Sequence, residues 1–127
     1  MSAESAAHAA LLAALGGIAG VSAVWPGPPA TASPPWIELG AIVSADWGTK
    51  DRAGRELRVS LTIADRGETP ARLHALAGAV TDAVLALPPM LDGWELTSIA
   101  LARARIAADR PGQWRAVQDY RLRLLAR

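Results

Sequence analysis

Apolar and polar residues alternate most clearly in residues 55–64. Every second position from residue 57 onward is aliphatic, while the positions between them carry charged or hydroxyl side chains. Because successive side chains of a β-strand point to opposite faces, this pattern predicts a strand with one face in the core. The predicted core residues are Leu57, Val59, Leu61 and Ile63.

Three other segments, residues 36–44, 94–105 and 114–125, are also predicted to be strands. In the first of them, the alternation places four aliphatic residues on the core face and leaves Ile42 as an exception. Those four residues are Ile37, Leu39, Ala41 and Val43. In the last, apolar residues share one face with Gln118 and Tyr120, and a mixture of arginine and aspartate follows the other.

The 3.6-residue period of a helix predicts two helices. In the first, leucines at helical spacing follow a capping serine, Ser2 or Ser5, and Gly16 stops the helix. The second is predicted to begin with Thr69 as its N-cap, followed by proline at the first helical position. It ends before Pro88, because proline cannot continue a helix.

Loops are predicted from turn-forming residues. Residues 47–54 are polar and bracketed by glycine, and the Asp-Arg-Pro-Gly sequence 109–112 favours a tight turn. Residues 26–35 contain five prolines, which indicates an extended connector. The resulting order is α-β-β-α-β-β over residues 1–127. It predicts one α+β two-layer domain, with an antiparallel or mixed four-stranded sheet and both helices packed on one face.

Composition excludes several classes of protein. Thirteen basic and 12 acidic residues give a net charge of +1, which argues against a strongly basic nucleic-acid binder. The absence of cysteine excludes a disulfide scaffold and a thiolate zinc site. Residues 8–25 are uncharged but diluted by alanine and glycine, so we expect a soluble N-terminal helix and no membrane segment.

No motif predicts catalysis. His8 and His74 are the only imidazole bases, and neither has a nucleophile and an acid at recognisable spacing. The glycines between residues 16 and 20 lack the Lys-Ser or Lys-Thr ending of a phosphate-binding loop. We therefore expect that the protein is not an enzyme and that it has no catalytic residue, cofactor or metal site.

Arginines are concentrated near the C-terminus. Arg103, Arg105, Arg121 and Arg123 are spaced so that they can share one face of the last predicted hairpin. One interpretation is a small nucleic-acid-binding module that uses this Arg-rich hairpin. The other is a solvated outer face that also discourages edge-to-edge pairing.

The five tryptophans suggest where contacts form. Trp36, Trp94 and Trp114 each begin a predicted strand, which favours roles in closing the core. Trp25 and Trp47 lie beside the connector and the loop, where burial within one subunit is harder to achieve. We therefore predict intersubunit or partner contacts at Trp47, Lys50, Arg52 and Trp25. The alternative for Trp47 is a side chain folded back over its own sheet.

The sequence resembles the tail terminator, or tail completion, proteins of long-tailed phages and gene transfer agents. The most specific match is Asp46 to Lys50 (DWGTK), which precedes an alternating strand. An N-terminal Leu/Ala helix leads to a Val-Trp-Pro-Gly segment at residues 24–27 and a Pro-Trp-aliphatic strand at residues 35–40. An Ala-rich helix and a late Arg-rich strand complete the resemblance. Ile63 to Gly67 departs from it, because an aromatic residue is expected there.

This resemblance implies a structural role in a virion. Such proteins form a hexameric ring at the head-proximal end of the tail tube, where the ring ends polymerisation of the tube. The implied partners are further copies of the chain, the major tail tube protein and the head connector or stopper protein. DNA passes through the lumen without being read for sequence. The implied location is the tail of a phage or gene transfer agent particle assembled in the bacterial cytoplasm.

Overall fold

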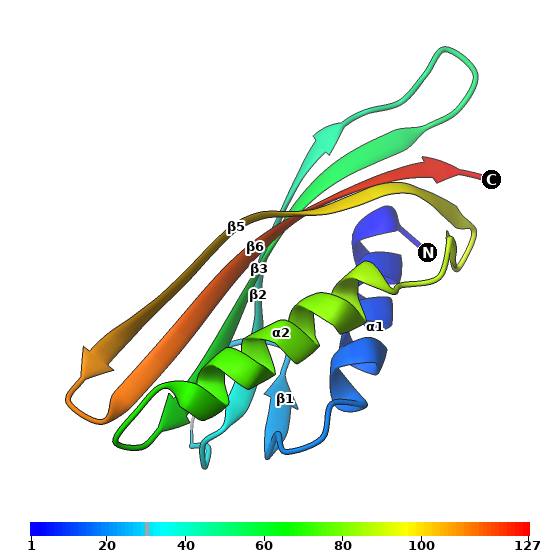
Figure 1. The fold of residues 1–127 in the computed structure, drawn as a ribbon. Helices are drawn as coiled ribbons and strands as arrows, with labels where there is room; N and C mark the ends of the chain where they lie inside the picture. The colour runs from blue at the N-terminus through cyan, green and yellow to red at the C-terminus, as the bar shows by residue number, and fades with distance from the viewer. Residues whose placement is uncertain (30) are drawn as a thin grey trace.

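Long strands form the centre of the structure, a computed structural model that describes residues 1–29 and 31–127 (Figure 1). They belong to a six-stranded mixed sheet with the strand order β1-β2-β3-β6-β5-β4. Two helices complete the fold. In chain order the elements are α1 (Ala3–Gly16), β1 (Ala23–Trp25), β2 (Trp36–Asp46), β3 (Gly54–Arg66), α2 (Ala71–Leu85), β4 (Met90–Leu91), β5 (Trp94–Arg110) and β6 (Gln113–Ala126).

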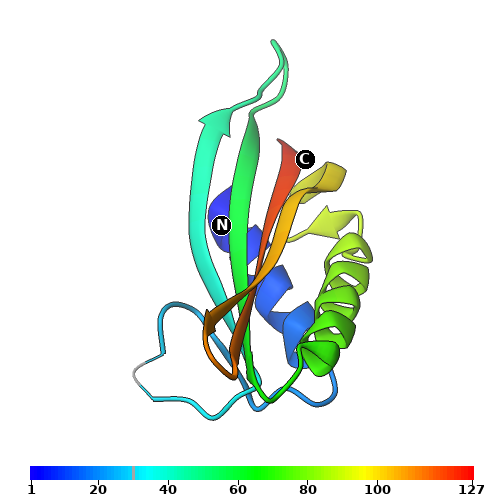
Figure 2. The same cartoon turned by 60° about the vertical axis from the view of Figure 1, so that its left-hand side comes forward.

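Both helices cover the same face of the sheet, and the other face is left open (Figure 2). Strands β2, β3, β6 and β5 are neighbours in antiparallel order, while β1 runs parallel to β2. The predicted α+β class is therefore confirmed. The prediction of a four-stranded sheet is wrong, because the short strands β1 and β4 add one strand at each edge.

The sequence contains a turn signal for the pairing of β4 but no local signal for the pairing of β1. β4 joins β5 through Asp92-Gly93, which have φ angles of 47° and 86°. Asp-Gly is a strong signal for this type of two-residue hairpin, because both positions need a positive φ. β1 has three residues and pairs in parallel with β2 from Ala23 opposite Trp36 onward. No local turn connects those two strands, so sequence pattern alone does not reveal their pairing.

A bulge in β2 changes which residues face the core. The pairing of β2 with β3 shifts between Leu39 and Ile42. Ile42 then lies opposite Val59 and packs against the core, whereas Val43 points outward and is 63% exposed. The predicted core positions of Ala41 and Val43 are therefore wrong, because both are exposed, and the exceptional Ile42 is a core residue. One extra residue in a strand reverses the direction of every side chain after it.

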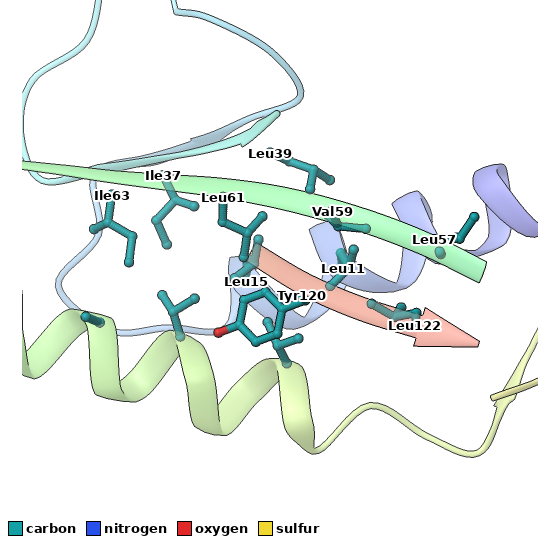
Figure 3. Close-up of a cluster of buried hydrophobic side chains, with 14 of the residues drawn as sticks. Leu11, Leu15, Ile37, Leu39, Leu57, Val59, Leu61, Ile63, Tyr120 and Leu122 are labelled. Atoms are coloured by element: carbon teal, nitrogen blue, oxygen red, sulfur yellow. The ribbon is translucent and has the colours of Figure 1, made fainter. Parts of the chain in front are cut away.

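The core lies between the sheet and the two helices (Figure 3). The four aliphatic residues predicted in β3 are at most 1% exposed, which confirms their core position. Leu11 and Leu15 of α1 meet them from the helix layer, and Tyr120 of β6 lies between the sheet and α2. Burial of these apolar surfaces is the main favourable contribution to folding.

A buried polar cluster joins β6 to α2 within this core. The Gln118 amide donates to the Ala77 carbonyl at 3.0 Å, and the Tyr120 hydroxyl donates to Gln118 Oε1 at 2.6 Å. Thr81 Oγ1 lies 3.1 Å from the Tyr120 hydroxyl. Burial raises the pKa of Tyr120 above its ordinary value. Because buried polar groups are costly when unpaired, this cluster favours one position of α2 on the sheet.

The helix starts agree only partly with the sequence. Ser2 caps α1 by accepting a hydrogen bond from the Ser5 amide at 3.1 Å. Of the two serines predicted as possible caps, Ser2 is therefore the one that caps the helix. In α2 the N-cap is Pro70, so the prediction of Thr69 as the N-cap is wrong. The Thr69 hydroxyl still accepts from the Ala71 amide at 3.4 Å, so it partners one of the first amides of the helix.

Asp65 connects the end of β3 to the first turn of α2. Its side chain is 6% exposed and accepts from Arg72 Nε at 2.8 Å and from the Arg66 amide at 2.8 Å. The hydrogen bond from Arg72 holds the pKa of Asp65 below its ordinary value, although burial acts in the opposite direction.

Asp65→Asn is expected to lower the free energy of unfolding at neutral pH by about 1–3 kcal/mol, because a charged acceptor is lost. A lowered folded-state pKa contributes stability that is present above the unfolded pKa and is lost as pH falls through the folded pKa. The difference between wild type and variant should therefore shrink below about pH 4 in denaturant titrations. Asp109→Asn, at an exposed pair with Arg115, is the control and should change stability by less than about 1 kcal/mol.

Candidate functional site

The hairpin formed by β2 and β3 projects beyond the helices, at the top of Figure 1. Its loop is ordered by its own polar groups. The Trp47 amide donates to the Gly54 carbonyl at 3.0 Å, and the Thr49 amide donates to the Arg52 carbonyl at 2.8 Å. Thr49 Oγ1 also accepts from the Arg52 amide at 3.0 Å. Lys50 and Asp51 form the exposed tip of this preorganised loop.

Arg52 attaches the loop to the C-terminal strand. Its Nε donates to the Ala126 carbonyl at 2.8 Å, and its guanidinium lies 3.7 Å from a Glu95 carboxylate oxygen. Gly54 is required at the base of the loop, because a Cβ there would lie 2.7 Å from Leu125 Cδ2 and 3.0 Å from the Leu124 carbonyl oxygen. Arg52 therefore acts within its own subunit.

Trp47 folds back over the open face of the sheet. The Arg123 guanidinium carbon lies 5.4 Å from the centre of its ring, within the range of a cation–π contact. Arg123 also donates through Nε to Glu56 at 2.8 Å, and this hydrogen bond lowers the pKa of Glu56. Trp47 is half-buried by this stacking. The remaining indole surface is exposed at the base of the projecting loop.

Trp25 lies at the other end of the sheet, in β1 opposite Glu38. It is half-buried, and its enclosed indole Nε1 has no hydrogen-bond partner among the described residues. The structure therefore brings Trp47, Lys50 and Arg52 together in one loop and leaves Trp25 apart from them.

The other tryptophans only partly match the predicted core roles. Trp94 and Trp114 are half-buried and pack against the core, and their indole nitrogens donate to the Met1 and Gly67 carbonyls. Trp36 is 9% exposed and stacks with Arg115. Trp36 pairs with Ala64, and the next pair along the strands, Ile37 and Ile63, points into the core. Because neighbouring side chains of a strand point to opposite faces, Trp36 lies on the open face.

The open face of the sheet carries the predicted row of arginines. Arg121 lies directly opposite Arg58 of β3, and Arg103 of β5 lies opposite Asp119. Arg105 pairs with Val117 on the same face. Asp119 and Glu56 reduce the positive charge of this surface, and Arg123 is already engaged by Glu56.

A groove of about 380 Å³ crosses this open face. Small or apolar side chains and two arginines form its walls. Its lining residues are Ala41, Val43, Arg58, Val59, Ser60, Ala102, Arg103 and Asp119. Sequence reasoning missed Val43 and Ala102 as surface residues, because both adjoin register shifts that a regular alternation does not reveal.

The described residues contain no group of three or more His, Asp or Glu side chains that could hold a metal ion. His74 is exposed on α2, and His8 is half-buried on α1. In the same part of the chain, no helix is long and apolar enough to cross a membrane.

Arg52→Met is expected to loosen the loop, because the hydrogen bond to Ala126 is lost. The rate of hydrogen exchange should rise roughly tenfold for the backbone amides of Trp47, Thr49 and residue 52. The rates of amides in the centres of β3 and β6 should stay unchanged. Hydrogen exchange followed by NMR measures this effect. Lys50→Met is the matched control and should leave the rates unchanged; an equal effect of both variants would refute the tethering role of Arg52.

Comparisons with known proteins agree with the architecture described above. A solved chain from a structure titled "Virion of native gene transfer agent (GTA) particle" is similar, with a TM-score of 0.76 and 22% sequence identity. The alignment covers 94% of each chain, and at this identity the likeness shows a shared fold. The search of curated proteins found no match. The family described as "Tail completion protein gp17" matches residues 6–125, and the chain therefore belongs to this family.

Proposed function

We propose that the protein is a tail terminator that forms a hexameric ring at the head-proximal end of the tail tube. Membership of the tail completion family makes it a structural protein of a virion tail. The similar chain belongs to a gene transfer agent virion, which supports assembly into a particle of that kind. The ring ends polymerisation of the tube and joins it to the head connector, while DNA passes through the lumen.

The single observation that supports assembly most strongly is the rigid, projecting hairpin of β2 and β3. A closed ring needs a heterologous interface, in which one patch of a subunit meets a different patch of the next. A loop that is ordered before contact loses less conformational entropy when it binds. The hairpin extends beyond the helix-covered part of the sheet, where a neighbouring subunit or the tube can reach it.

The proposed contact residues have different roles. Lys50 lies exposed at the tip, and no ion pair engages it in the described part of the chain. Trp47 offers the outer part of its ring, and Arg52 holds the loop in place. Trp25 provides a second contact at the other end of the sheet through the exposed part of its half-buried ring.

The test is the mass of the protein in solution, alone and with purified tail tube protein. A hexamer, formed either alone or upon addition of tubes, is expected, together with tubes of limited length. A protein that remains monomeric in the presence of tubes, and leaves their growth unchanged, would show that the proposed function is wrong.

Trp47→Ala and Lys50→Glu are each expected to weaken assembly. Each should raise the protein concentration needed for half-maximal assembly by roughly tenfold or more. Trp47→Ala should cost the isolated subunit only about 0.5–1 kcal/mol, because the cation–π contact is partly exposed. Arg66→Glu, at the exposed last residue of β3, is the matched control for Lys50→Glu, because it lies at the opposite end of that strand. Sedimentation measures assembly, and circular dichroism checks the fold. Equal assembly by Trp47→Ala and wild type would contradict the contact role of this tryptophan.

A second candidate function, binding of nucleic acid through the open face, is favoured by one observation. Arg58 and Arg121 lie directly opposite each other on adjacent strands, and anions relieve the repulsion between such like charges. If this were the main function, the affinity for short DNA duplexes would fall steeply with salt and would depend on Arg121. A terminator that only lets DNA pass needs no such affinity.

A further inference from the structure

Large apolar side chains are exposed at few places in residues 1–29 and 31–127. They are Met1, Val43, Leu85 and Met90. Val43 is 63% exposed and lies on the open face of the sheet, whereas Met90 lies in β4 on the opposite edge strand. Single exposed apolar residues are common, but Val43 lies between exposed alanines and Met90 lines an apolar groove, so each of these two belongs to a larger apolar surface.

Met90 forms one wall of an apolar groove beside α1, with a volume of about 380 Å³. Alanines of α1 form the other wall, and Asp92 lies at the groove as its one charged residue. The lining residues are Met1, Ala6, Ala9, Ala10, Pro88, Met90, Leu91 and Asp92. α1 has no charged side chain after Glu4, so the exposed side of this helix is apolar or weakly polar.

The groove is preorganised by the tight hairpin of β4 and β5. Leu91 is 4% exposed and anchors β4 in the core, while its neighbour Met90 points outward. The Leu96 amide donates to the Pro89 carbonyl at 2.8 Å, and the Arg127 amide donates to the Gly93 carbonyl at 3.0 Å. These bonds hold the turn, so the groove needs no ordering before it binds.

Val43 and its cross-strand neighbour Arg58 form a surface of complementary character. They lie directly opposite each other on β2 and β3 and face away from the core. β1 pairs with β2 at Trp36–Glu38, so the edge of β2 near Val43 has no partner strand in the described part of the chain. Ala41 and Ala45 are small and exposed on either side, which lets a groove approach Val43 closely.

The charges of the two surfaces match. Arg58 has a 54% exposed side chain and lies 3.8 Å from Glu56, the longest ion pair within the described residues. Asp92 makes no ion pair or side-chain hydrogen bond within the same part of the chain. One surface is therefore apolar with an available cation, and the other is apolar with an available anion.

We infer that Val43 and Arg58 of one copy dock into the groove of the next copy, with Val43 against Met90 and Arg58 beside Asp92. This inference rests on the proposed ring and names the contact that closes it. The two surfaces are different patches that lie toward opposite edges of the sheet, and a head-to-tail ring of identical subunits joins two such different patches. The contact leaves the tip of the β2–β3 hairpin available beside it.

Disulfide trapping tests the contact directly, because the natural chain contains no cysteine. One sample carries Val43→Cys and another carries Met90→Cys, and the two are mixed under assembly conditions with mild oxidant. The mixture should give a disulfide-linked dimer, whereas neither variant alone should cross-link. Val117→Cys mixed with Met90→Cys is the matched control, since Val117 lies on the open face opposite Thr62, four residues along β3 from Arg58.

Charge reversal provides the second measurement. Arg58→Glu and Asp92→Asn are each expected to raise the concentration needed for half-maximal assembly by roughly tenfold, and Arg58→Glu combined with Asp92→Lys should recover most of the loss. Arg66→Glu is the control. Circular dichroism checks every variant, because Asp92 has a positive φ that lysine adopts less readily.

Each outcome separates this contact from the proposed function. Wild-type rings without cross-linking in the mixture, or cross-linking of either variant with itself, would overturn the contact and leave the ring intact. Normal rings of Arg58→Glu that fail to bind tubes would also overturn it, because Arg58 would then contact the tube protein and not the next copy of the chain. A wild type that forms no ring in the presence of tubes would reject both proposals.

Discussion

The difference in length between strands and helices determines the shape of this protein. β5 has 17 residues and β3 has 13, whereas the helices have 14 and 15. A strand advances about 3.3 Å per residue and a helix about 1.5 Å, so β5 extends about 56 Å and α2 about 22 Å. The helices can therefore cover only the middle of the sheet. The β2–β3 hairpin therefore projects beyond the helices, where most of its loop is exposed.

Within the covered region, the inner face of the sheet is specified by apolar packing and by one polar cluster. The Gln118–Tyr120–Thr81 hydrogen bonds place α2, and the Asp65–Arg72 pair ties its first turn to β3. The outer face has no such cover. Its arginines, its exposed Val43 and its shallow groove are properties of a surface that meets water or another protein, which agrees with a structural protein of a virion tail.

The hairpin loop illustrates how one feature can stabilise its own subunit and present the contacts that we propose. Within one subunit, Arg52 donates a hydrogen bond to Ala126, and Trp47 stacks with Arg123. Lys50 at the tip of the loop remains exposed. A loop braced in this way presents the same surface before and after binding. The groove beside α1 is braced similarly by the Asp92-Gly93 turn. Rigid surfaces at different places on a subunit favour a closed assembly over a variable one.

The sequence by itself determined the α+β class, both helices, the four long strands and the core residues of β3, because periodicity records which face of an element is buried. The positions of the tryptophans also indicated the loop at residues 47–54 as a contact candidate, which stays a prediction. The tertiary structure alone decided the pairing of β1, the reversal at the β2 bulge that exposes Val43, and the separation of Trp25 from Trp47. These features depend on register between strands distant in sequence, and Ile42, which breaks the alternation in β2, is the local trace of the shift that places it in the core.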